Sequence, residues 1–221
     1  MAVLVYVLTG RYKTDQRPNM ETQAVKGANT KEQILQAACR LIHRQGFNST
    51  SLDAILRESG VGKGNFYYHF KSKDELGHAV LDRLALWTQE QVGREVFRGD
   101  EDPIAEIFGL FDFIVDMQRE TGCVGGCPLG NLALELSDIH DGFRRRIEEI
   151  LTMWQNQISE TLTRAQAKGQ LARNVHSQRV AEFIIAGIEG GILLAKARKD
   201  ISVLEGCLDE LKKYLRMHIV S

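Results

Sequence analysis

Apolar side chains recur every three or four residues along most of the chain from Thr30 onward, and this spacing predicts amphipathic helices. No segment shows the regular alternation of apolar and polar residues that is typical of a strand. Proline is scarce, with 3 residues in 221, which favours helices without interruption. The pattern therefore predicts an all-α fold of roughly nine helices.

Capping residues mark where several of these helices start and stop. A capping box at residues 30–33 predicts the start of the first helix, and Gly46 predicts its end. A second box at residues 72–75 predicts the start of a long helix. Asp102, directly before a proline, predicts another start. Further starts are expected at Pro128, Asp141, Ser177 and Ser202.

The most informative pattern lies between residues 49 and 76, where the spacing predicts two short helices joined by a tight turn. Thr50 is expected to cap the first of these helices. Gly60 is placed for the left-handed residue that ends it. Phe66 and Phe70, four residues apart, predict the buried face of the second helix. This arrangement is typical of a helix-turn-helix.

Burial of the two phenylalanines leaves an outward face of unusual chemistry, made of Lys63, Asn65, Tyr67, Tyr68 and His69. Tyrosine hydroxyls suit DNA phosphates, and lysine and asparagine reach base edges in the major groove. A helical hairpin whose aromatic residues pack on a neighbouring subunit is the alternative, because short helix-turn-helix patterns give many false positives.

Residues 30–76 resemble the DNA-binding domain of the TetR/AcrR family, and the string G-K-G-N-F-Y-Y-H-F-K-S-K-D-E-L from Gly62 is close to its recognition-helix signature. The resemblance implies a helical dimer whose C-terminal domain binds a small molecule and thereby releases operator DNA. It implies operator contacts at Thr50, Lys63, Gly64, Asn65, Tyr67, Tyr68, His69 and Lys73. A solvated charge is the alternative for Lys73. We expect a tail over residues 1–29, the DNA-binding domain over 30–76, and effector binding and dimerisation over 77–221.

The charge distribution agrees with a specific DNA binder. The net charge is −1, yet residues 11–75 carry 11 Lys and Arg against 7 Asp and Glu, an excess of 4 positive charges. The apolar run at residues 2–8 is too short to span a membrane and lacks the features of a secretory signal, so no membrane association is expected. Met20 is an alternative start of translation.

Four cysteines, Cys39, Cys123, Cys127 and Cys207, form no recognisable disulfide framework, which indicates reduced thiols in the cytoplasm. The spacing of Cys123 and Cys127 fits no ordinary zinc site, and we expect neither a metal nor a cofactor. Cys127 directly precedes a predicted helix, where the helix dipole lowers the pKa of a thiol. A repressor that senses electrophiles or oxidants through Cys127 is therefore the alternative function.

The segment G-C-P-L-G-N-L-A-L-E, from Gly126 to Glu135, resembles one found in a subset of the TetR family. We expect a small apolar effector to bind among aromatic and apolar residues of the second domain, with Asn131 as a polar contact. The expected residues are Trp87, Phe108, Phe111, Cys127, Asn131, Leu134 and Trp154. Simple core packing is the alternative for the aromatic residues.

The last two predicted helices, Ser177 to Lys199 and Ser202 to Ile219, are expected to form the homodimer interface. Glycine costs helix stability, so the glycines at 187, 190 and 191 indicate close approach of another helix. The six histidines are scattered without catalytic spacing, which argues against an enzyme. The function predicted from the sequence is a ligand-responsive regulator, most simply a repressor, of a palindromic double-stranded operator.

Overall fold

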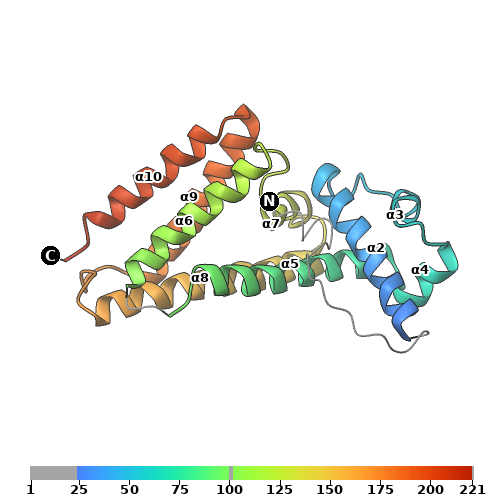
Figure 1. Cartoon of the computed structure of the whole chain (residues 1–221), viewed down its shortest axis with the longest axis horizontal. Helices are drawn as coiled ribbons and strands as arrows, with labels where there is room; N and C mark the ends of the chain where they lie inside the picture. The colour runs from blue at the N-terminus through green and yellow to red at the C-terminus, as the bar shows by residue number, and fades with distance from the viewer. Residues whose placement is uncertain (1–23, 100–101, 221) are drawn as a thin grey trace. The chain divides into compact units, whose positions relative to one another are not determined.

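The structure, a computed structural model, describes residues 24–99 and 102–220, with side chains from Asn29 onward. The expected apolar run at residues 2–8 and the Met20 start lie outside the described residues. Within them the chain forms nine α-helices and no strand beyond an isolated bridge between Leu171 and Ile219, so the all-α prediction is confirmed (Figure 1). The helices are α2 (Ala24–Gln45), α3 (Leu52–Ser59), α4 (Lys63–His69), α5 (Lys73–Glu95), α6 (Pro103–Glu120), α7 (Pro128–Leu136), α8 (Asp141–Ala167), α9 (Ser177–Arg198) and α10 (Ile201–Arg216).

The chain divides into two compact units. Of the described residues, the first unit contains 24–85 together with Asn131–Arg144, and the second contains Leu86–Gly130 together with 145–220. The two units therefore meet within α5, between Ala85 and Leu86. The first unit also includes a later segment, from the middle of α7 to the start of α8. The helical periodicity of that segment does not indicate which unit it joins.

In the first unit, α2, α3 and α4 pack around Ile34, Ile55 and Phe66, whose side chains are fully buried. Phe47, just beyond the end of α2, lies against Phe143 with 4.9 Å between the ring centroids. Gly77 of α5 fits where these rings meet, because a Cβ atom there would lie 2.6 Å from the Phe47 ring and 2.7 Å from the Phe143 ring. The start of α8 is therefore part of the core behind the helix-turn-helix.

In the second unit, α6, α9 and α10 lie side by side (Figure 1). Two glycines of α9 permit the approach of α10: a Cβ atom at Gly187 would lie 2.7 Å from Leu211 Cδ1, and one at Gly191 would lie 2.8 Å from Leu204 Cδ1. Packing within one protomer thus explains both positions. At Gly190 an added Cβ atom would meet nothing within 4 Å, so intrachain packing does not explain that glycine.

Several predicted helix ends are confirmed, and others differ, such as those of α10, which runs from Ile201 to Arg216 rather than from Ser202 to Ile219. Asp102 caps α6 by accepting from the N–H groups of Ile104 and Ala105, and the predicted left-handed glycine at the end of α3, Gly60, has φ +68°. The first helix begins at Ala24 rather than at Thr30, so the capping box there lies inside a helix. The cap of α3 is Ser51 rather than Thr50, because the Ser51 hydroxyl accepts from the Ala54 N–H.

None of the helices in the described part of the chain combines the length and the apolar content that a membrane crossing requires.

Replacing Gly77 by alanine tests the aromatic packing of the first unit. Alanine favours a helix over glycine by about 1 kcal/mol, but the added methyl group would collide with two buried rings. We expect Gly77→Ala to lower the free energy of unfolding by about 1–3 kcal/mol, measured by urea denaturation. Gly93→Ala on the same helix, where an added Cβ meets nothing within 4 Å, should be neutral or stabilising. A stabilised Gly77→Ala protein would contradict the packing.

Candidate nucleic-acid interface and effector unit

The turn between α3 and α4 sets the angle of a helix-turn-helix. Gly60 occupies the left-handed conformation that ends α3, and its N–H donates to the Arg57 carbonyl. Val61 follows, buried, with its N–H donating to the Leu56 carbonyl at 3.3 Å. Residues that favour the left-handed region are rare apart from glycine, so Gly60 makes this tight connection possible.

The helix α4 presents the outward face that the sequence predicts. Phe66 and Phe70 are buried, whereas Tyr67 and Tyr68 are 51% and 83% exposed. Lys63, Gly64 and Asn65 are exposed as well, and His69 is half-buried with its ring against Tyr68. Two exposed tyrosines on a seven-residue helix form a surface that is costly to leave in water and suited to a polyanion with apolar base edges.

Two of the residues expected at the DNA interface occupy other environments. Thr50 is fully buried, and its hydroxyl donates to the Gly46 carbonyl at 2.6 Å, so its side chain offers DNA no exposed atom. Lys73 is half-buried, with Nζ 4.3 Å from the centroid of the Phe47 ring. Burial lowers the pKa of Lys73, while Asp74 and Glu135 raise it. The ammonium group is thus engaged in a cation–π contact rather than fully solvated.

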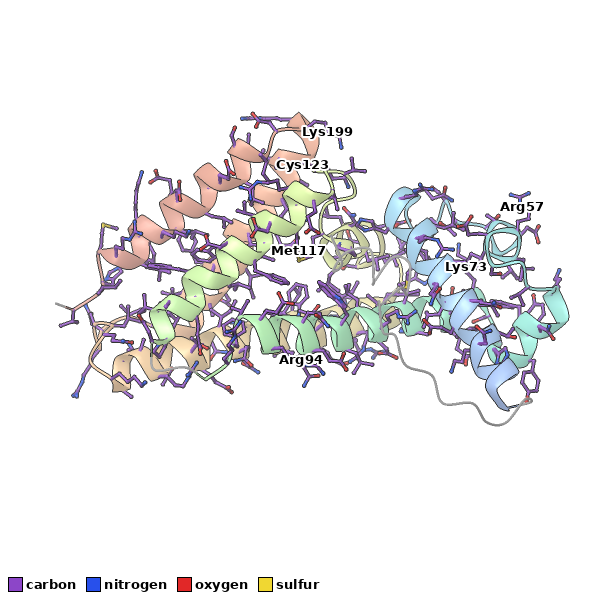
Figure 2. All side chains as sticks on the ribbon, in the orientation of Figure 1. Arg57, Lys73, Arg94, Met117, Cys123 and Lys199 are labelled. Carbon is purple, nitrogen blue, oxygen red and sulfur yellow. The ribbon has the colours of Figure 1, made fainter. Side chains whose placement is uncertain are left out.

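The sequence pattern did not single out two residues that the structure brings to this region. Arg57 is an exposed cation on α3 (Figure 2), and the excess of basic residues in residues 11–75 was the only signal for it. Glu135 of α7 accepts hydrogen bonds from the N–H groups of Phe47 and Asn48 at 2.8 and 2.6 Å. Its only signal was its place at the end of the G-C-P-L-G-N-L-A-L-E segment.

The residues expected to bind an effector do not all lie in one environment. Trp87, Phe108, Phe111, Cys127 and Trp154 belong to the second unit, whereas Asn131 and Leu134 belong to the first. Leu134 is 78% exposed, because the turn of α7 that buries Leu132 and Leu136 directs it outward. Phe111 is fully buried in the core formed with α9 and α10, so simple packing explains it.

Two tryptophans of the second unit each have a buried indole N–H group. Trp87 of α5 is 7% exposed, and its indole Nε1 is buried without a hydrogen-bond partner among the described residues. The indole Nε1 of Trp154, on α8, is also buried and lacks a partner there. A buried N–H without an acceptor is costly, so each donor is available to a ligand that brings one.

Cys127 lies in an environment that suppresses thiolate formation. Burial raises the pKa of Cys127 well above its usual value, and the Glu189 carboxylate raises it further. The thiol donates to Glu189, whose own pKa is raised by burial. Gly130 is adjacent, because a methyl group there would overlap the Glu189 carboxylate. The pKa of Cys127 is therefore raised rather than lowered as the helix dipole predicted, because burial and the Glu189 carboxylate outweigh the hydrogen bonds from the Gly130 and Leu129 N–H groups.

The loop that leads to Cys127 is fastened at its other cysteine. Cys123 adopts a left-handed conformation with φ +58°, and its carbonyl accepts from Lys199 Nζ at 3.2 Å (Figure 2). Lys199 ends α9, also with a left-handed conformation. The described residues contain no group of three or more His, Cys, Asp or Glu side chains that could hold a metal ion.

Comparison with known proteins identifies the family. Residues 34–80 match the family model of bacterial regulatory proteins of the tetR family, and residues 103–210 match the tetracyclin repressor-like C-terminal domain. An uncharacterized HTH-type transcriptional regulator in the lacX 3′ region of Lactococcus lactis subsp. lactis is 38% identical over 184 residues, covering 83% of this chain and 92% of that protein. The chain belongs to the TetR family.

Solved structures of TetR-family regulators share the fold. A TetR transcriptional regulator from Chloroflexus aurantiacus J-10-FL is 27% identical, with a TM-score of 0.80 over 88% of this chain and 98% of its own. The reduced form of Escherichia coli NemR has a TM-score of 0.78 at 23% identity, over 87% of this chain and 97% of its own. The N-terminal helix-turn-helix and C-terminal helical domain expected from the sequence are therefore confirmed.

The environment of Cys127 predicts slow alkylation. The thiolate is the reactive form, and a raised pKa keeps the thiol protonated at pH 7–9, where a free cysteine ionises. We expect iodoacetamide to modify Cys127 of the folded protein at least about tenfold more slowly at pH 8 than the same residue in urea, followed by peptide mass spectrometry. Equal rates in the folded and unfolded protein would show that the thiol is neither buried nor held by Glu189.

Proposed function

We propose that this TetR-family protein is a homodimeric repressor that binds a palindromic operator and releases it when a small effector binds. The observation that carries the proposal is the outward face of α4, where Tyr67 and Tyr68 are exposed beside Lys63 and Asn65. It acts in the cytoplasm, where bacterial DNA is located.

The proposed DNA contacts follow from exposure on α4. Lys63 and Asn65 contact base edges or phosphates in the major groove, and Tyr67 and Tyr68 contact phosphates and thymine methyl groups. Gly64 allows close approach of the backbone, and His69 lies at the edge of the same face. Thr50 is left out of the set because it is buried. Lys73 supports the structure behind the interface through Phe47 rather than contacting DNA.

The proposed dimer forms through α9 and α10. Apolar or small residues on one side of α9 are exposed in the protomer, namely Phe183, Ala186, Leu193, Leu194 and Ala197, and the half-buried Gly190 lies among them. They recur at helical spacing, and Phe183 continues onto α10 through a ring contact with Tyr214 at 5.3 Å. A second copy packed against this stripe by two-fold symmetry would bury it. Two reading helices would then face successive major grooves, about 34 Å apart or a multiple of that distance.

The proposed effector binds in the second unit beside Trp87 and Trp154. Their buried indole N–H groups favour a molecule that is mostly apolar but carries hydrogen-bond acceptors, such as carbonyl or ether oxygens. The effector prefers a conformer in which the two reading helices no longer match the operator. Thiol sensing through Cys127 has one support, the likeness to NemR, whose structure is described as a reduced form. The raised pKa of Cys127 favours the ligand-responsive alternative.

Fluorescence anisotropy tests the DNA-binding proposal. The purified protein is titrated into a labelled duplex from upstream of its own gene and into a scrambled duplex, at two salt concentrations. We expect tight binding to the native sequence alone. Tyr68→Ala should weaken this binding by roughly tenfold or more. Lys63→Ala should reduce the slope of log affinity against log salt concentration by about one. Lys168→Ala, an exposed lysine at the end of α8, is the control. Equal binding of both duplexes would contradict operator recognition.

Substitution of Gly190 tests the dimer. Because an added Cβ meets nothing within 4 Å in the protomer, Gly190→Arg should fold, with helix propensity improved by up to about 1 kcal/mol. The arginine side chain would obstruct a second copy, so we expect a monomer by light scattering and loss of tight operator binding. Gly93→Arg, also in open space on a helix, should remain dimeric. A dimeric Gly190→Arg protein would place the interface elsewhere.

A further inference from the structure

The Glu135 carboxylate binds the backbone at the point where α2 ends. Its two oxygens accept from the Phe47 N–H at 2.8 Å and from the Asn48 N–H at 2.6 Å. Glu135 is 88 residues away from Phe47 along the chain, yet it belongs to the same compact unit. Hydrogen bonds from N–H groups to an ionised carboxylate are about twice as strong as bonds between neutral groups. This carboxylate is therefore a strong anchor for the turn between α2 and α3.

The turn is shaped to receive this carboxylate. Gly46 has φ +85°, and a Cβ atom there would lie 2.7 Å from Glu135 Oε2, so a larger residue would displace the carboxylate. The Phe47 ring is held by Phe143 on one side and by Lys73 Nζ at 4.3 Å. Backbone and side chain of the same residue are thus both fixed by groups outside α2 and α3.

The anchored turn leads directly into the helix-turn-helix formed by α3 and α4. The Thr50 hydroxyl donates to the Gly46 carbonyl at 2.6 Å, and its N–H donates to the Phe47 carbonyl at 3.2 Å. Gln45 closes the same turn by donating to the Ser49 carbonyl at 3.1 Å. The next residue, Ser51, caps α3. A shift of the Phe47 backbone therefore displaces the residues that start α3, and α3 carries α4 through the tight turn at Gly60.

We propose that Glu135 is a positioning residue for DNA binding: it fixes the turn between α2 and α3 and thereby the placement of the reading helices, without contacting DNA itself. Residues 24–85 alone accordingly do not supply every contact that positions the helix-turn-helix. It requires a carboxylate supplied from α7, in the domain matched by the C-terminal family model. The expected effect on operator affinity rests on the proposed function. The anchoring of the turn rests on the two hydrogen bonds alone.

Two readouts on the full-length protein test the proposal. The first is hydrogen exchange of the backbone amides of Phe47 and Asn48, and the second is anisotropy with the labelled duplex from upstream of its own gene. Glu135→Gln keeps the size of the side chain but replaces one accepting oxygen by an NH₂ group that cannot accept. We expect exchange at the two amides to rise by about tenfold or more, with operator affinity reduced by roughly tenfold.

Leu136→Val is the matched control, because Leu136 is fully buried on the same turn of α7 and its substitution destabilises the unit without altering the carboxylate. If Glu135 were merely structural, Glu135→Gln and Leu136→Val of equal stability would bind the duplex equally, and the proposal would be overturned. We expect only Glu135→Gln to lose affinity under conditions where both proteins are folded by circular dichroism.

Gly46→Ala approaches the same contact from the other side and covers the case in which Glu135→Gln does not fold. The added methyl group displaces the carboxylate, so we expect faster exchange at Phe47 and Asn48 and weaker binding to the duplex. Slow exchange at both amides in Gly46→Ala and in Glu135→Gln would overturn the anchoring. If wild-type protein binds no duplex, the proposed function fails, and the exchange data still decide whether Glu135 holds the turn.

Discussion

Burial of Phe66 and Phe70 is the constraint on which the proposed DNA-contacting surface of α4 depends. A helix of seven residues is too short to be stable alone, so α4 exists because these two rings fix it to the rest of its unit. Once they are buried, helical geometry determines which residues face outward. The same two contacts therefore provide the stability of α4 and select Lys63, Asn65 and the two tyrosines for the surface.

The surroundings of α4 fix its orientation through backbone groups as well as through the buried Val61 of the turn. Gly60 provides the left-handed residue of the turn, Ser51 caps α3, and Glu135 holds the turn before it. Gly60 adopts a backbone conformation that residues with a Cβ atom rarely adopt. Ser51 and Glu135 accept hydrogen bonds from backbone N–H groups that have no other partner in a helix. A protein that reads DNA needs this rigidity, because a small error in helix placement removes several base contacts together.

The sequence alone was sufficient for features that depend on local chemistry. Helical periodicity predicted the nine helices, and the spacing of Phe66 and Phe70 predicted the exposed face of α4. Features that depend on distant residues were not predictable in this way. The cation–π contact of Lys73 depends on Phe47, and Glu135 of α7 belongs to a unit that consists mostly of residues far from it in the chain. The raised pKa of Cys127 likewise depends on Glu189 of another helix, which no local pattern around the cysteine indicates.

The outward face of α4 is proposed to contact bases in the major groove, and methylation interference detects such contacts. Guanine N7 lies in that groove, and its methylation blocks the acceptor that a side chain would contact. Bound and free fractions of a partly methylated duplex from upstream of the gene are separated and compared. We expect interference at guanines in two symmetric half-sites, lost or weakened for the Lys63→Ala protein. Tight binding with no interference at any guanine would contradict major-groove reading by α4.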